Sequence, residues 1–164
     1  MDKVINYFTG EKEESYIFLI LGMVGLAMSI YFILVNASSF WRGLAIPFVI
    51  VSVLEVIVGV TLIYRSPKDI IRVEHYIKNE KSKIKTVEIP RMEKVMKNFV
   101  IFRNTEIALI LAGICIYFIF GKFDFWKGLG LGFFIQASVV LTLDYFAEKR
   151  GFIYLEHLNK IANE

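Results

Sequence analysis

Four ionisable side chains interrupt the apolar parts of this sequence and are the residues best placed to do chemistry. They are Glu55, Arg103, Glu106 and Asp144. A charged side chain at the centre of a membrane helix costs roughly 2.5 to 3.5 kcal/mol, so such residues turn towards one another or towards a polar cavity. Arg103 and Glu106 share one helix face, from which they can pair locally or bridge to Glu55 and Asp144. Three carboxylates around one guanidinium leave surplus negative charge that could hold a proton or a cation.

Two further polar residues extend this predicted site. Gln136 lies at the middle of the last apolar run, and Arg65, at the inner end of the second run, could reach the same place by snorkelling. The same charges also have a structural interpretation, in which a buried ion-pair cluster fixes the helix register. The full predicted set, as a ligand- or ion-binding site or as an ion-pair cluster, is Glu55, Arg103, Glu106, Asp144, Gln136 and Arg65.

Four apolar runs must position these side chains. The chain of 164 residues is 56% hydrophobic, and its mean hydropathy is +0.56. The runs cover residues 16–35, 44–64, 107–120 with an amphipathic lead-in from Phe99, and 125–146, and each can span about 30 Å as a helix. The sequence therefore predicts an all-α, four-helix transmembrane bundle forming a single integral membrane domain over residues 1–164. We expect the first run to be a retained helix, because the acidic segment before it is unlike a signal peptide.

The basic residues predict how the bundle is oriented. If both termini and the central segment share one side, that side holds 16 of the 19 Lys and Arg residues. Because cytoplasmic loops carry the excess of Lys and Arg, both termini are expected in the cytoplasm, with the protein in a bacterial inner membrane. The two outer connections, near residues 36–40 and 121–124, are short, which leaves no external domain.

The sequence contains an internal repeat. FWRGL at 40–44 returns as FWKGL at 125–129, IYFI at 30–33 returns at 116–119, and the two histidines recur as Glu74-His75 and Glu156-His157. The repeated segments occur in the same order along the chain. Two parallel two-helix repeats are therefore expected, over about residues 16–80 and 100–164. An axis along the membrane normal would relate them.

Residues 65–98 are expected to form a cytoplasmic helical connector. Ser66 and Pro67 predict a new helix start, with Ser as the N-cap and Pro in the first turn. Pro90 predicts a second start, followed by an apolar stripe that runs directly into the third span and extends that helix into the cytoplasm. The connector carries ten basic and five acidic residues. We expect these basic residues to contact the lipid bilayer through its anionic head groups rather than nucleic acid.

Several classes of chemistry have no signature in this sequence. There is no HExxH, Walker A or GxSxG motif, and the single cysteine, Cys115, excludes an intramolecular disulfide. Both histidines are predicted outside the bilayer. We therefore expect no cofactor, no metal and no enzymatic activity. A membrane enzyme acting on lipid head groups through Glu106, Asp144 and Arg103 is the least favoured alternative.

Two stretches carry a resemblance to known sequences. EIPRMEKVMKNFVIFRNTE at 88–106 and DYFAEKR at 144–150 resemble a group of uncharacterised small four-span bacterial membrane proteins. The resemblance implies a similar membrane architecture. It implies no activity, ligand or site.

Two function classes are consistent with these patterns. In the first, the charged cluster forms a cytoplasm-facing site for the movement or sensing of a proton, a cation or a small solute. In the second, the protein is a membrane-resident partner, such as a toxin-immunity factor or an assembly subunit, and the cluster is structural. Glycine-rich packing faces, such as Gly128 to Gly132, also suit a homo-oligomer or a contact with a partner membrane protein.

Overall fold

The computed structural model describes residues 2–35 and 38–163, which form long helices and contain no strand. The elements are α1 (Asp2–Leu34), α2 (Ser39–Asn79), α3 (Lys81–Lys83), the π-helical turn η1 (Ile84–Glu88), α4 (Ile89–Ile119) and α5 (Asp124–Asn163). The predicted all-α fold with four long helices is confirmed. Residues 36 and 37 of the first predicted outer connection lie outside the described part of the chain.

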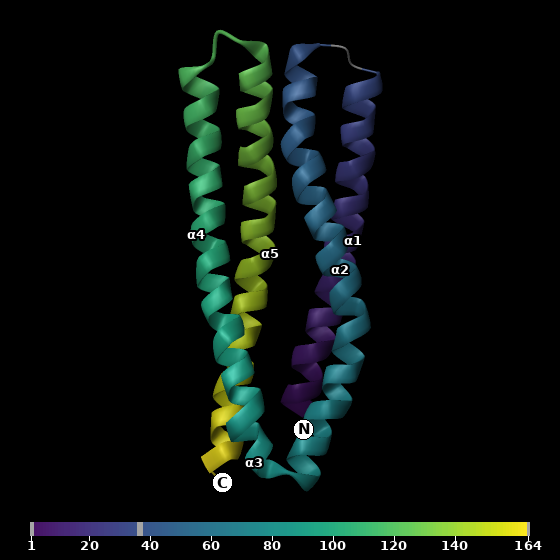
Figure 1. Ribbon diagram of the computed structural model, residues 1–164, viewed down its shortest axis with the longest axis vertical. Helices are drawn as coiled ribbons and strands as arrows, with labels where there is room; N and C mark the ends of the chain where they lie inside the picture. Colours follow the sequence, from purple (N-terminus) through teal and green to yellow (C-terminus); the bar gives the residue numbers. More distant parts are fainter. Residues whose placement is uncertain (1, 36–37, 164) are drawn as a thin grey trace.

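The four long helices form two antiparallel hairpins that stand side by side. Figure 1 shows α1 with α2 and α4 with α5, with both termini and α3 at one end of the bundle. We call this end the terminal end and the opposite end the loop end. α2 and α5, the second helices of the two repeats, pack against each other at the centre.

Each long helix is apolar and long enough to cross a membrane, which supports a multi-pass membrane protein. The apolar runs occupy the loop-end halves, where large hydrophobic side chains such as Leu34 and Phe118 are exposed. At 1.5 Å per residue, the 41 residues of α2 extend about 60 Å, roughly twice the thickness of the hydrocarbon layer. The terminal-end halves are therefore long enough to extend beyond the bilayer.

Gly43 and Gly128 bring the central helices together through two matching contacts. A Cβ atom added at Gly43 would overlap the carbonyl oxygen of Phe125, and one added at Gly128 would overlap that of Phe40. These residues occupy equivalent positions in the repeated FWRGL and FWKGL segments. The contacts are therefore reciprocal, as expected when two parallel repeats are related by a pseudo-twofold axis.

A hydrophobic core holds the terminal end together. Its buried side chains come from all four long helices and from η1, so the connector packs as part of the bundle. They are Val4, Tyr7, Phe8, Val73, Ile84, Ile89, Met92, Tyr154 and Leu158. This core continues the helical packing beyond the apolar runs.

The predicted helix start at Ser66 and Pro67 is wrong, because α2 passes through both residues and ends at Asn79. Ser66 is buried, and its hydroxyl donates to the Glu11 carboxylate at 2.8 Å. Pro67 removes one backbone donor, but buried residues on both sides of it, including Ser66 and Val73, keep the segment helical. The start predicted at Pro90 is confirmed, since α4 begins at Ile89 with the proline in its first turn.

Candidate functional site

The predicted site residues lie in separate groups and do not form one cluster. Glu55 and Glu106 face the bundle interior, with 3% and 6% of their surfaces exposed, and Asp144 is half-buried. The acidic residues therefore avoid the lipid-facing surface, as the cost of charge in hydrocarbon requires. Their contacts differ from one residue to the next.

Glu106 and Asp144 form an acid pair between α4 and α5. Their side-chain carboxyl groups lie close together, and the Oε2 atom of Glu106 is buried with no hydrogen-bond partner among the described residues. Two ionised carboxylates in contact repel each other, because neither has a donor, so a shared proton or a cation would relieve this repulsion. The acid pair is the one contact between two members of the predicted acidic set that the described residues provide.

Arg103 pairs with Glu148 and not with the predicted acidic residues. Its Nη1 atom lies 2.8 Å from each carboxylate oxygen of Glu148, which joins α4 to α5. Glu148 lies one helical turn beyond Asp144 on α5, and Arg103 lies nearly one turn before Glu106 on α4. The ion pair therefore lies about one turn closer to the terminal end than the acid pair does. Sequence reasoning missed Glu148, although its four-residue spacing from Asp144 places both on one face of α5.

Glu55 belongs neither to the acid pair nor to the Arg103–Glu148 ion pair. Its two carboxylate oxygens are buried and have no hydrogen-bond partner among the described residues. One turn earlier on α2, the Ser52 hydroxyl lies 3.4 Å from the Nε2 atom of Gln136, which donates to it from α5. The Cα of Gly25 from α1 packs against the same hydroxyl, since an added Cβ would overlap it. Gln136 therefore takes part in a helix-packing contact rather than in the acid pair.

Arg65 forms its ion pairs with residues that are not in the predicted set. It lies 2.8 Å from Glu11 of α1 and 3.3 Å from Asp69 of its own helix. A second pair, between Arg150 and Glu14, joins α5 to α1. Sequence reasoning placed Arg65 in the membrane cluster because it follows the apolar run, but acidic residues on α1 offer nearer partners.

A buried network around Glu88 connects η1 to its neighbours and was not predicted. The fully buried Glu88 carboxylate accepts hydrogen bonds from Arg91 at 2.6 and 3.1 Å and from Tyr154 at 3.0 Å, while Arg72 of α2 approaches it at 3.4 Å. Tyr7 of α1 stacks on Tyr154 at 4.3 Å between ring centroids. Burial, followed by nearby negative charge, raises the pKa of both tyrosines. The Glu88 carboxylate in this network is fully hydrogen-bonded, which suits it to fixing the connector.

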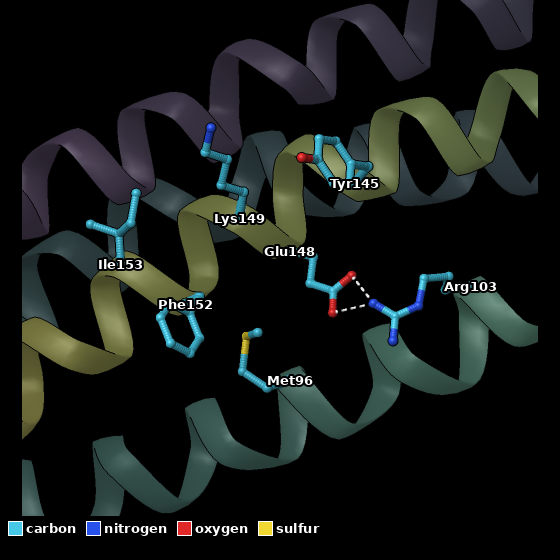
Figure 2. Close-up of a pocket in the computed structure, with 7 residues that line it drawn as sticks. All are labelled: Met96, Arg103, Tyr145, Glu148, Lys149, Phe152 and Ile153. Atoms are coloured by element: carbon cyan, nitrogen blue, oxygen red, sulfur yellow. Dashed lines mark hydrogen bonds and ion pairs between the residues drawn. The ribbon is translucent and has the colours of Figure 1, made fainter.

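A groove between α4 and α5 leads to the acid pair. It consists of two adjoining hollows of about 450 and 410 Å³ that share Arg103, Tyr145 and Glu148. Figure 2 shows the hollow nearer the terminal end, with the Arg103–Glu148 ion pair on its wall and Phe152 close to Met96. Asp144 lines the hollow nearer the loop end, so one member of the acid pair borders the groove and the other is buried behind it.

The comparisons find no family model, no curated protein and no solved structure that matches this chain. Within residues 2–35 and 38–163, no group of three or more His, Cys, Asp or Glu side chains could hold a metal ion. The candidate site is the acid pair together with its groove.

Proposed function

We propose that this protein is a non-enzymatic, multi-pass membrane protein that senses protons or small cations at the Glu106–Asp144 acid pair. The observation that carries this proposal is the meeting of two carboxyl groups from different helices, one buried and one bordering a groove. The excess of basic residues at the terminal end supports a cytoplasmic location for that end, in a bacterial inner membrane.

The chemistry of the pair supports a binding role. Two ionised carboxylates in contact repel each other, and a shared proton or a bound cation replaces that repulsion with attraction. Because Glu106 belongs to α4 and Asp144 to α5, occupancy of the pair changes how strongly these two helices attract each other. A change in proton or cation concentration is thereby converted into a change in helix packing.

The packing beyond the acid pair favours sensing over conduction. Nearer the loop end, Gly113 of α4 and Gly130 of α5 are in close backbone contact, since a Cβ added at Gly113 would lie 2.6 Å from the Gly130 carbonyl oxygen. Gly43 and Gly128 close the seam between α2 and α5 in the same half of the bundle. These contacts oppose a continuous polar path from the groove to the loop end.

Carbodiimide labelling tests the proposal, because the reagent modifies protonated carboxyl groups in apolar surroundings. We expect Glu106 or Asp144 to be labelled in purified protein at neutral pH, with labelling suppressed in alkaline buffer or by a bound cation such as Na⁺. Glu106→Gln and Asp144→Asn each remove one carboxyl group and the repulsion it exerts on the other, so labelling of the remaining carboxyl group should fall. Glu55→Gln is the matched control, since Glu55 is equally buried but outside the pair.

Absence of pH-dependent labelling at both positions would overturn the sensing proposal. Proton or cation flux in liposomes, lost in Glu106→Gln but kept in Glu55→Gln, would replace sensing with transport. Flux measurements therefore distinguish the two forms of the ion-site hypothesis.

The second candidate is a membrane-resident partner protein, such as an immunity factor or an assembly subunit. It is favoured by α4, in whose most apolar stretch only 11% of residues are buried, against 28% in each of the other three spans. Its exposed Leu111 and Phe118 could contact another helix. Purification from native membrane should then recover a stoichiometric partner that is lost in Leu111→Asn. Purification of the protein alone would refute this candidate.

A further inference from the structure

We propose that the groove between α4 and α5 binds one anionic phospholipid, with its phosphate at Arg103 and an acyl chain along the loop-end hollow. This inference does not depend on proton sensing at the acid pair. It rests on the position of the groove along the bundle, on the free donors of Arg103 and on the change from charged to apolar walls.

Arg103 lies where a phospholipid head group would be found. It precedes the apolar run at residues 107–120, whereas the preceding turns of α4 carry Lys94 and Lys97. Its side chain is 42% exposed, and both hollows of the groove include it. The guanidinium therefore stands at the boundary between the apolar and charged halves of the bundle.

The guanidinium retains donors for a phosphate. Both contacts to Glu148 use Nη1, at 2.8 Å, and no other interaction of Arg103 occurs among the described residues. Figure 2 shows the other terminal nitrogen directed away from Glu148. Because Arg presents five N–H donors in a planar fork, Nε and Nη2 remain available to an anionic oxygen. Lys149 lines the same terminal-end hollow, so two positive side chains, Arg103 and Lys149, accompany its single carboxylate, Glu148.

The loop-end hollow suits an acyl chain. Its apolar walls come from both helices, with Phe99 and Ile107 on α4 and Leu141 and Phe146 on α5. It adjoins the terminal-end hollow on the side facing the membrane-spanning runs. A phosphate at Arg103 and a chain between the helices are therefore in the correct order for a lipid in a bilayer leaflet.

Two variants that break the same ion pair test this inference. In Arg103→Gln, the guanidinium is lost, and we expect binding of phosphatidylglycerol to fall about tenfold or more, since a charge-assisted hydrogen bond of this kind is worth about 1.5 to 3 kcal/mol. In Glu148→Gln, the guanidinium is released from its carboxylate, and binding should stay the same or increase. Adducts of phosphatidylglycerol on the detergent-purified full chain, counted by native mass spectrometry, provide the measurement.

Lys78→Gln is the matched control, because it removes one exposed positive charge at the same end of the bundle, away from the groove. It should leave binding unchanged, and Leu141→Trp, which fills the apolar hollow, should weaken it. Equal loss in Arg103→Gln and Glu148→Gln would show that only the ion pair matters and would overturn the proposal. Equal binding of phosphatidylcholine, or displacement by inorganic phosphate, would also overturn it, the latter in favour of a free-phosphate site.

Discussion

The hydroxyl of Tyr154 donates a 3.0 Å hydrogen bond to the carboxylate of Glu88, although the two residues lie 66 positions apart and both are buried. This bond ties α5 to the turn that precedes α4. Two arginines hold the same carboxylate, so the buried charge is compensated by three donors from three elements. Compensation of this kind is the condition under which a buried carboxylate is tolerated.

Tyr154→Phe should destabilise the terminal end. The substitution keeps the ring and its stacking on Tyr7 but removes one donor to a buried carboxylate, which costs about 1.5 to 3 kcal/mol. Unfolding in detergent micelles, followed by circular dichroism, measures the loss. Tyr64→Phe is the control, because Tyr64 is largely exposed and should change the free energy of unfolding very little. Equal stability of the two variants would contradict the structural role of the Glu88 network.

The two buried tyrosines, Tyr7 and Tyr154, predict that the stability of the protein depends on pH in the alkaline range. Burial raises the pKa of Tyr7 and Tyr154 above the usual value of 10.0, so above pH 10 the folded chain retains phenolic protons that the unfolded chain loses. The free energy of unfolding must therefore fall as pH rises beyond that value, by up to about 1.4 kcal/mol per pH unit for each tyrosine. Tyr154→Phe should show a shallower slope. An unchanged slope in the variant would show that Tyr154 ionises normally in the folded protein.

Gly43→Ala and Gly128→Ala should have similar effects on the α2–α5 seam. At each position the new methyl group would overlap a backbone carbonyl of the facing helix, so the helices must separate, at a cost of about 1 to 3 kcal/mol. Gly10→Ala provides the control, because its methyl group would meet only the flexible side chain of Arg150. Thermal unfolding of the three variants distinguishes them. A large effect at only one of the two seam positions would contradict the pseudo-twofold relation.

The architecture was predictable because hydrocarbon thickness and helix rise determine how long an apolar run must be. The repeated segments around Gly43 and Gly128 further indicated which helices are equivalent, and the reciprocal contacts agree with that reading. The helix start predicted at Ser66 was wrong because a prediction from local sequence signals takes no account of tertiary contacts. Buried neighbours such as Val73 outweighed the missing donor of Pro67.

The site was predictable only in part. Periodicity indicates which face of a helix a residue occupies, so the inward position of Glu55 and Glu106 followed from the cost of charge in lipid. Periodicity does not determine the axial offset between helices, and that offset decides which side chains meet. Arg103 consequently pairs with Glu148, while Glu55 has no hydrogen-bond partner among the described residues.

Glu55→Leu should stabilise the protein or leave its stability unchanged. Both oxygens of Glu55 are buried without a hydrogen-bond partner in the described part of the chain, and a buried polar group in that condition costs about 1 to 3 kcal/mol that an apolar side chain of similar size does not. Glu106→Leu should do the opposite, because it removes the polar contact with Asp144 that joins α4 to α5. Unfolding in detergent micelles measures both variants under the same conditions. Clear destabilisation by Glu55→Leu would mean that the carboxyl group of Glu55 makes a stabilising interaction in the membrane. Glu55 would then be a second candidate functional residue, in addition to the acid pair.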